Sequence, residues 1–205
     1  MIEINQIVNT PITSNCYVIF DKAVGNLCLV VDPGSNDNSI LCDFLCSENL
    51  IPQYIILTHE HFDHCWGVND LRGRYRTVKL VCSSLCSVAI QNMKKNYSVF
   101  YEQPGFELEA AEIEIVQRCS LDWNTHKINL ALAQGHSASG LLFTIGKYLF
   151  TGDELIKDTK TVTKLKTGSK EKLKESITLF KKMKGLGLIV CPGHGETFDL
   201  DEYKL

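Results

Sequence analysis

One short segment constrains this chain more than any other. It places three histidines and an aspartate within six residues, at His59, His61, Asp63 and His64, directly after the apolar run Tyr54–Thr58. Neutral imidazole and carboxylate are ligands that suit zinc, iron or manganese, and no sulfur ligand belongs to the pattern. Composition alone would produce H-x-H-x-D-H with a probability on the order of a few in ten thousand. The segment therefore predicts a metal centre on a loop that a strand anchors.

The spacing of these ligands also carries information. On an extended turn His59 and His61 point the same way, whereas Asp63 and His64 diverge. The histidines lie two and three residues apart, so the segment is not the H-E-x-x-H motif of a helix. We expect the loop to serve two adjacent ions rather than one.

Alternating apolar residues and turn residues predict a mixed α/β chain. Strands are predicted over Ile2–Val8, Cys16–Phe20, Leu27–Asp32, Tyr54–Thr58, Val78–Cys82, Glu112–Val116, Ile128–Ala133 and Leu186–Cys191, and Leu141–Thr151 is predicted as a hairpin that turns at Gly146-Lys147. Helices are predicted around Ile40–Leu45, from Ser83 or Ser84 to about Lys95, and from the capping residue Ser169 to the stop at Gly185. The first three strands should form an antiparallel meander, and Pro52 should separate the first helix from the strand that follows it.

The segment Asn96–Ala111 has no clear periodicity. It contains Pro104, Gly105 and four aromatic residues. Two interpretations stay open: a surface loop that borders a binding cleft, and a satellite hydrophobic cluster.

Length and charge set the broad class. A chain of 205 residues is expected to form a single domain, residues 1–205. Its formal charge of −3 offers no basic field for nucleic acid, so we expect a small-molecule substrate. No run approaches the roughly 20 apolar residues that span a bilayer, and Met1–Thr10 lacks the features of a secretory signal. The expected location is the cytoplasm, without membrane attachment.

The nine cysteines are expected to be free thiols. Their number is odd, and disulfides are rare in a reducing compartment. Cys28 and Cys82 fall inside apolar patterns, where cysteine acts as a small hydrophobe. The i,i+4 pairs Cys42/Cys46 and Cys82/Cys86 are not assigned to a metal, because structural zinc sites more often use C-x2-C.

The sequence resembles the metallo-beta-lactamase superfamily from about Ser14 to Phe198. The hallmark H-x-H-x-D-H is followed by a distant histidine, an aspartate and a last histidine, which match His136 in Gln134-Gly135-His136-Ser137, Asp153 in Thr151-Gly152-Asp153 and His194 in Pro192-Gly193-His194-Gly195. Asp32, before Pro33-Gly34, matches the family's first acidic motif. The resemblance implies a four-layer αβ/βα sandwich.

The resemblance also implies a ligand set. One ion would be held by His59, His61 and His136, and a second by Asp63, His64 and His194, with Asp153 bridging both. Asp32 is expected to order the loop rather than to bind metal. His126 is the one histidine outside the set, and we expect it to be exposed in a loop near Trp123.

The implied chemistry is hydrolysis. Two divalent ions, zinc before iron or manganese, lower the pKa of a shared water and aim the hydroxide at a polarised carbonyl or phosphoryl group. Asp63 is the predicted catalytic residue, because it can orient the nucleophile and pass its proton to the leaving group. Cys65 is not expected to act as a nucleophile, since the neighbouring His64 is committed to metal.

Within the superfamily the chain is similar to short glyoxalase II-like hydrolases of thioesters or related esters. It departs from them in three ways: the P-G-H-T loop appears here as Gln134-Gly135-His136-Ser137, Glu154–Thr167 has no Gly-Arg element, and the chain stops soon after His194. The alternatives are a mono-iron enzyme like the persulfide dioxygenases and a phosphodiesterase or nuclease of the same fold. His61 argues against the flavodiiron type, which has glutamate there, and a metal-storing module is disfavoured by the complete ligand set.

Overall fold

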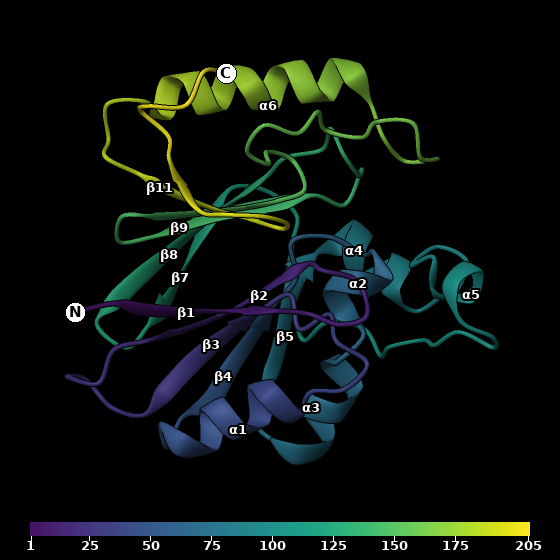
Figure 1. Cartoon of the computed structure of the whole chain (residues 1–205), viewed down its shortest axis with the longest axis vertical. Coiled ribbons are helices and arrows are strands. Elements are labelled where there is room, and N and C mark those ends of the chain that lie inside the picture. The colour runs from purple at the N-terminus through teal and green to yellow at the C-terminus, as the bar shows by residue number, and fades with distance from the viewer.

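Two β-sheets packed face to face form the centre of the molecule, and helices cover both outer faces (Figure 1). The computed structural model describes residues 1–205. The layers run helix, sheet, sheet, helix, which confirms the predicted four-layer α/β sandwich.

The N-terminal sheet has the strand order β1-β2-β3-β4-β5-β6. Its strands are β1 Glu3–Val8, β2 Asn15–Phe20, β3 Leu27–Val31, β4 Ile51–Ile56, β5 Lys79–Ser83 and β6 Ile113–Ile115. The first three pair antiparallel, which confirms the predicted meander. From β3 to β6 the strands are parallel and are joined by helical crossovers. One prediction here is wrong, because Pro52 lies inside β4 rather than before it. Pro52 pairs with Cys28 of β3 and Tyr54 pairs with Leu29, so Gln53 is left unpaired. This bulge accommodates the proline.

Both faces of this sheet are buried, because each faces a different partner. Along β2, Cys16 and Val18 belong to the core under the helices, whereas Tyr17 and Ile19 belong to the core between the two sheets. The strands therefore read as nearly continuous apolar runs. The sheet is fixed from both sides, which makes the ends of its strands rigid supports for loops.

The helices of the N-terminal half are mostly short. They are α1 Ser39–Ser47, α2 Phe62–Cys65, α3 Val68–Arg74, α4 Ser84–Ile90 and α5 Ser98–Tyr101. Ser83 caps α4 by accepting from the amide of Cys86, as predicted. The predicted extension of this helix to Lys95 is wrong, because the side chain of Asn92 accepts from the amides of Lys94 and Lys95 and closes a turn instead.

The second sheet has the order β12-β11-β10-β9-β8-β7. Its strands are β7 Cys119–Trp123, β8 His126–Leu132, β9 Leu141–Ile145, β10 Tyr148–Gly152, β11 Ile189–Pro192 and β12 Phe198–Asp199. The hairpin of β9 and β10 turns at Gly146-Lys147, and only Gly146 has a positive φ, as in a type II′ turn. The predicted start of the last long strand at Leu186 is wrong, since Gly187 has φ +64° and β11 begins two residues later.

The prediction for His126 is also wrong. This residue begins β8 and pairs with the buried Trp123 of β7, a strand that the sequence analysis did not find. Its Nε2 lies 2.8 Å from a carboxylate oxygen of Asp21, which holds the ring against the sheet and leaves it only partly exposed.

Helix α6, Lys170–Met183, covers the outer face of the second sheet (Figure 1). Ser169 caps it and Gly185 follows it with φ +85°, as predicted. Its buried Phe180 packs with Leu149 and Val190 of the sheet. None of the helices in the structure is both long and apolar enough to cross a membrane.

Candidate metal centre

The candidate ligands lie after the ends of strands at one rim of the sandwich, in loops and, for Asp63 and His64, in the short helix α2. Four come from the segment after β4, and the others follow β8, β10 and β11. Residues far apart in sequence thereby fall into three groups whose potential ligand atoms lie within 4.8 Å of one another: His59, His61 and His136; His59, His64 and Asp153; Asp63, His64 and His194. The structure thus brings together all seven residues that the resemblance implied.

The second of the implied sites contains Asp63, His64 and His194, with Asp153 beside them. Nε2 of His194 lies 3.4 Å from Oδ2 of Asp63 and 3.5 Å from Oδ2 of Asp153. Nε2 of His64 lies 3.7 Å from Oδ2 of Asp63 and 3.6 Å from Oδ1 of Asp153. Potential donor atoms from four side chains therefore lie close together here.

Asp153 also reaches the first site. Its Oδ2 lies 3.7 Å from Nε2 of His136, and that nitrogen lies 3.2 Å from Nδ1 of His61. The ring of His59 lies 4.4 Å from that of His61, centroid to centroid. Asp153 therefore stands between the two trios, the position that a bridging carboxylate needs.

Unpartnered buried atoms support the fit to metal. Nε2 of His59, His61 and His64 and Oδ1 of Asp153 are buried and make no hydrogen bond. Buried polar atoms without partners are rare and costly, and here they belong to residues of the candidate ligand groups. Divalent cations would satisfy Nε2 of His59 and His64 and Oδ1 of Asp153, because nitrogen and carboxylate oxygen donors are what such ions bind, whereas His61 faces His136 through its Nδ1.

Four histidines have their remaining ring nitrogen fixed by the surrounding protein. Nδ1 of His64 lies 3.0 Å from Asp32, and Nδ1 of His59 lies 3.0 Å from Oγ1 of Thr58. Nδ1 of His136 and of His194 lie 2.8 Å and 3.1 Å from backbone carbonyl oxygens. Such outer partners set the tautomer and the direction of the ring.

The electrostatics of the two trios differ. Burial lowers the pKa of His59 well below its usual value and lowers that of His61 to about 4, so these imidazoles are neutral and ready to bind. Burial also opposes charge on His64, but Asp63, Asp153 and Asp32 outweigh it and raise its pKa to about 10. The carboxylates make this side of the centre strongly negative, and an ion bound there would replace a proton on His64.

The sequence analysis missed Glu60, which occupies the variable position between His59 and His61. Its carboxylate is buried and accepts from the hydroxyls of Ser137, at 2.6 Å, and Ser139. It thereby ties the first metal loop to the loop that carries His136. The only signal in the sequence is a charged residue inside a motif that follows a buried strand.

Glu154 was missed as well. Its buried carboxylate accepts from the amide of Gly135, at 2.9 Å, and from that of His136, at 2.7 Å. The residue after the expected bridging aspartate therefore holds the backbone of another candidate ligand. Backbone partners of this kind leave no pattern in a sequence.

The glycines beside the ligands are needed for space. A Cβ on Gly193 would lie 2.2 Å from Oδ1 of Asp153, and a Cβ on Gly135 would lie 2.5 Å from Oε1 of Glu154. The two loops can approach the centre closely only without these side chains.

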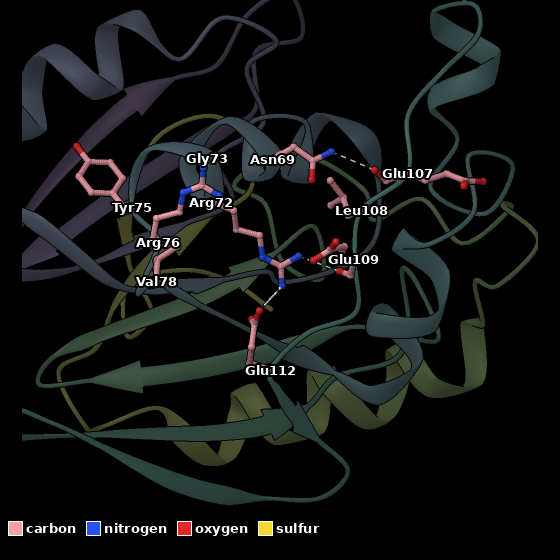
Figure 2. Close-up of a pocket in the computed structure, with 10 residues that line it drawn as sticks. All are labelled: Asn69, Arg72, Gly73, Tyr75, Arg76, Val78, Glu107, Leu108, Glu109 and Glu112. Atoms are coloured by element: carbon pink, nitrogen blue, oxygen red, sulfur yellow. Dashed lines mark hydrogen bonds and ion pairs between the residues drawn. The ribbon is translucent and has the colours of Figure 1, made fainter.

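A large open cavity of about 700 Å³ lies away from these ligands, between α3 and the segment before β6 (Figure 2). Arg72 crosses it and donates to the backbone oxygens of Glu109 and Ala110 and to the carboxylate of Glu112. Arg72 and Glu112, two of its charged residues, are thus paired with each other. None of the seven candidate ligands lines it, and it provides no alternative metal site.

The helix-sheet-sheet-helix sandwich and this rim of histidines and aspartates define a class of metal-dependent hydrolases. The model of the metallo-beta-lactamase superfamily matches residues 9–194, and the chain belongs to this superfamily. It is 26% identical to an uncharacterized protein of Mycobacterium leprae, over 89% of this chain and 87% of that protein. It is 25% identical to a hydroxyacylglutathione hydrolase of Serratia proteamaculans, over 90% of this chain but only 64% of the hydrolase.

The crystal structure of the BLEG-1 B3 metallo-beta-lactamase is also similar. It superposes with a TM-score of 0.88 at 26% identity, and the match covers 97% of this chain and 94% of that one. Fold and family therefore agree over nearly the whole chain.

Proposed function

We propose that this protein is a binuclear metallohydrolase that cleaves thioesters or related esters. One observation carries the proposal: Asp153 lies within 3.7 Å of His64, His136 and His194, so a single carboxylate faces both trios. In this proposal His59, His61 and His136 hold one ion, Asp63, His64 and His194 hold the other, and zinc is the expected metal.

When bound, two such ions supply Lewis acidity, which lowers the pKa of a water from about 15.7 towards 7 and polarises the scissile carbonyl group. The protein supplies the geometry. Asp63 is ionised, because His64 and His194 hold the pKa of its carboxyl below its usual range against the opposing effect of burial. Its carboxylate can therefore accept a proton from the nucleophile and pass it to the leaving thiolate or alkoxide.

The substrate class is supported by similarity to the Serratia hydrolase, whose name identifies an acylated glutathione as its substrate. A thioester suits a centre of this kind, because a thiolate leaves readily and needs little protonation. We therefore propose a small-molecule thioester or ester as the partner of this site, with nucleic acid disfavoured by the net charge of −3.

Metal analysis and a substrate panel test the proposal together. Purified protein should contain about two zinc ions and should hydrolyse S-lactoylglutathione or a simpler acyl thioester faster than a chromogenic phosphodiester. One iron per chain, with oxygen consumption on a persulfide, would instead support the dioxygenase-like alternative. Preferential cleavage of the phosphodiester would support the nuclease alternative.

Variants test the ligand assignment. His61→Ala and Asp153→Ala should abolish turnover and reduce metal content, whereas His126→Ala should keep the metal, since this ring pairs with Asp21. Cys65→Ser should retain most activity, because the thiol is fully buried and donates to the backbone of Glu60. Full loss of activity in Cys65→Ser with the metal retained would refute the proposed mechanism.

A further inference from the structure

The segment Asn96–Phe106 brings aromatic side chains to the edge of the candidate metal centre. The ring of Tyr97 lies against that of His61, with centroids 5.0 Å apart and planes at 79°. Its hydroxyl approaches the backbone of Lys166, on the loop that precedes α6. Tyr97 therefore connects a candidate ligand with a second loop at the same rim.

This segment is held firmly by hydrogen bonds. The side chain of the buried Asn96 donates to the backbone oxygen of Phe106, at 2.9 Å, and accepts from the amide of Ser98, at 2.9 Å. Its backbone oxygen accepts from the amide of Phe62, also at 2.9 Å. Since Phe62 lies between His61 and Asp63, the segment is fastened directly to the metal loop.

Aromatic stacking adds a second attachment. Tyr101 of α5 stacks on Phe62 at 4.9 Å, and Phe106 stacks on Trp66 at 5.6 Å, centroid to centroid. Phe62 begins α2, the helix that contains Asp63 and His64. The position of the aromatic segment is thus tied to that of the candidate ligands.

The backbone of Tyr97 has φ +66°. A bulky residue rarely adopts this left-handed conformation, and strained residues persist only where the surrounding structure enforces them, most often at functional sites. The contacts of Asn96 enforce it here, and the result is that the Tyr97 ring is directed to His61.

Part of this aromatic surface remains uncovered. Phe100 lies next to Tyr97, with centroids 6.2 Å apart, and is 73% exposed. Val162 of the loop before α6 is 51% exposed, while its backbone oxygen accepts from Nδ1 of His136. Exposed apolar side chains therefore occur on segments fastened to both His61 and His136.

We propose that Tyr97 and Phe100 form a subsite for an apolar group of the substrate, beside the ion that His61 and His136 would hold. The inference rests on the proposed function and adds a substrate class to it: esters or thioesters with an aliphatic chain or aromatic ring a few bonds from the scissile carbonyl. A cluster that served only packing would bury its rings, whereas Phe100 is largely exposed and Tyr97 contacts a candidate ligand.

A two-armed substrate series tests the subsite. One arm compares acetyl, butyryl and hexanoyl thioesters of one thiol, and the other compares acetyl thioesters of 2-mercaptoethanol and benzyl mercaptan. We expect kcat/KM to rise along one of the two arms. Along the acyl arm the rise should be about twofold for each methylene that contacts Tyr97 or Phe100, roughly half the gain of a fully buried methylene. The arm that responds identifies the side of the substrate that carries the apolar group.

Phe100→Ala should reduce this preference at least fourfold. Ile40→Ala removes a side chain of similar exposure, 62%, from the distant α1 and should leave the preference unchanged. Flat responses along both arms, or an undiminished preference in Phe100→Ala, would overturn the inference while leaving thioester hydrolysis intact.

Product binding separates the inference from the proposed function. Calorimetry on zinc-loaded protein should show tighter binding of hexanoate than acetate, or of benzyl mercaptan than 2-mercaptoethanol, and Phe100→Ala should remove the difference. Equal binding within both pairs would overturn the subsite even if no thioester were hydrolysed. A difference without thioester hydrolysis would retain the subsite and refute only the reaction.

Discussion

The carboxylate of Asp32 lies 3.0 Å from Nδ1 of His64, opposite the ring nitrogen that faces Asp63 and Asp153. The same carboxylate accepts from the amide of Thr58 at 2.8 Å and from its hydroxyl at 2.6 Å. Asp32 thus joins the end of β3 to both ends of the metal loop. It fixes the His64 tautomer that leaves Nε2 free for an ion.

Asp32→Asn should weaken metal binding about 10- to 100-fold with little change in fold, because the new amide group presents a donor to the donors of Thr58 and His64. The dissociation constant for zinc, measured by competition with a chromogenic chelator, checks this. Asp43→Asn, an exposed substitution on α1, serves as the control and should bind zinc normally. Equal affinities in the two variants would show that Asp32 has no role in ordering the centre.

Gly193→Ala should abolish metal loading, because the added Cβ would lie 2.2 Å from Oδ1 of Asp153 and 2.8 Å from Cε1 of His64. Gly73→Ala is a matched control within α3, where a Cβ meets nothing within 4 Å. It should bind metal normally and raise the free energy of unfolding by up to about 1 kcal/mol. Metal content and urea denaturation of both variants check the prediction, and two ions in Gly193→Ala would contradict the close approach.

The sequence predicted the elements that position the centre better than the contacts that support it. The meander, the hairpin at Gly146 and the capped helix after Ser169 each depend on local patterns and were confirmed. The spacing of His59 to His64 is local too, whereas the positions of His136, Asp153 and His194 were expected only through resemblance to a family. Their convergence depends on the packing of two sheets, which no local pattern records.

The hydrogen bonds that hold the ligand loops in place could not be predicted from the sequence for the same reason. Glu154 acts through backbone amides of Gly135 and His136, and Glu60 acts through hydroxyls 77 and 79 residues away. His126 was placed in a loop because β7 is short and only half apolar, so its pairing with Asp21 was missed.

Glu60→Ala should lower the free energy of unfolding by about 1 to 3 kcal/mol, because it leaves the buried hydroxyls of Ser137 and Ser139 without their acceptor. Glu60→Gln keeps one acceptor oxygen and should lose less. Urea denaturation of the metal-free proteins checks this without any contribution from ions. An alanine variant as stable as the parent would show that the link between the two metal loops contributes nothing.

The buried thiols predict a pH dependence of stability. Burial raises the pKa of Cys65, Cys16 and Cys86 well above the usual value and that of Cys28 to about 12. A group whose pKa is higher in the folded than in the unfolded state stabilises the fold fully below its unfolded value. That stabilisation is lost as the pH rises through the folded value, because only the unfolded chain can release the proton easily. The unfolding free energy should therefore fall above about pH 8.5, the ordinary pKa of a thiol.

Alkylation identifies the groups responsible, because the thiolate is the reactive form. At pH 8 iodoacetamide should modify the exposed Cys46 first and leave Cys65 unmodified, as peptide mapping by mass spectrometry would show. All nine cysteines should react in guanidinium chloride, which serves as the control for intrinsic reactivity. If Cys65 reacted in the native protein as fast as Cys46, its thiol would be accessible beside His64, and the exclusion of Cys65 from the chemistry would have to be abandoned.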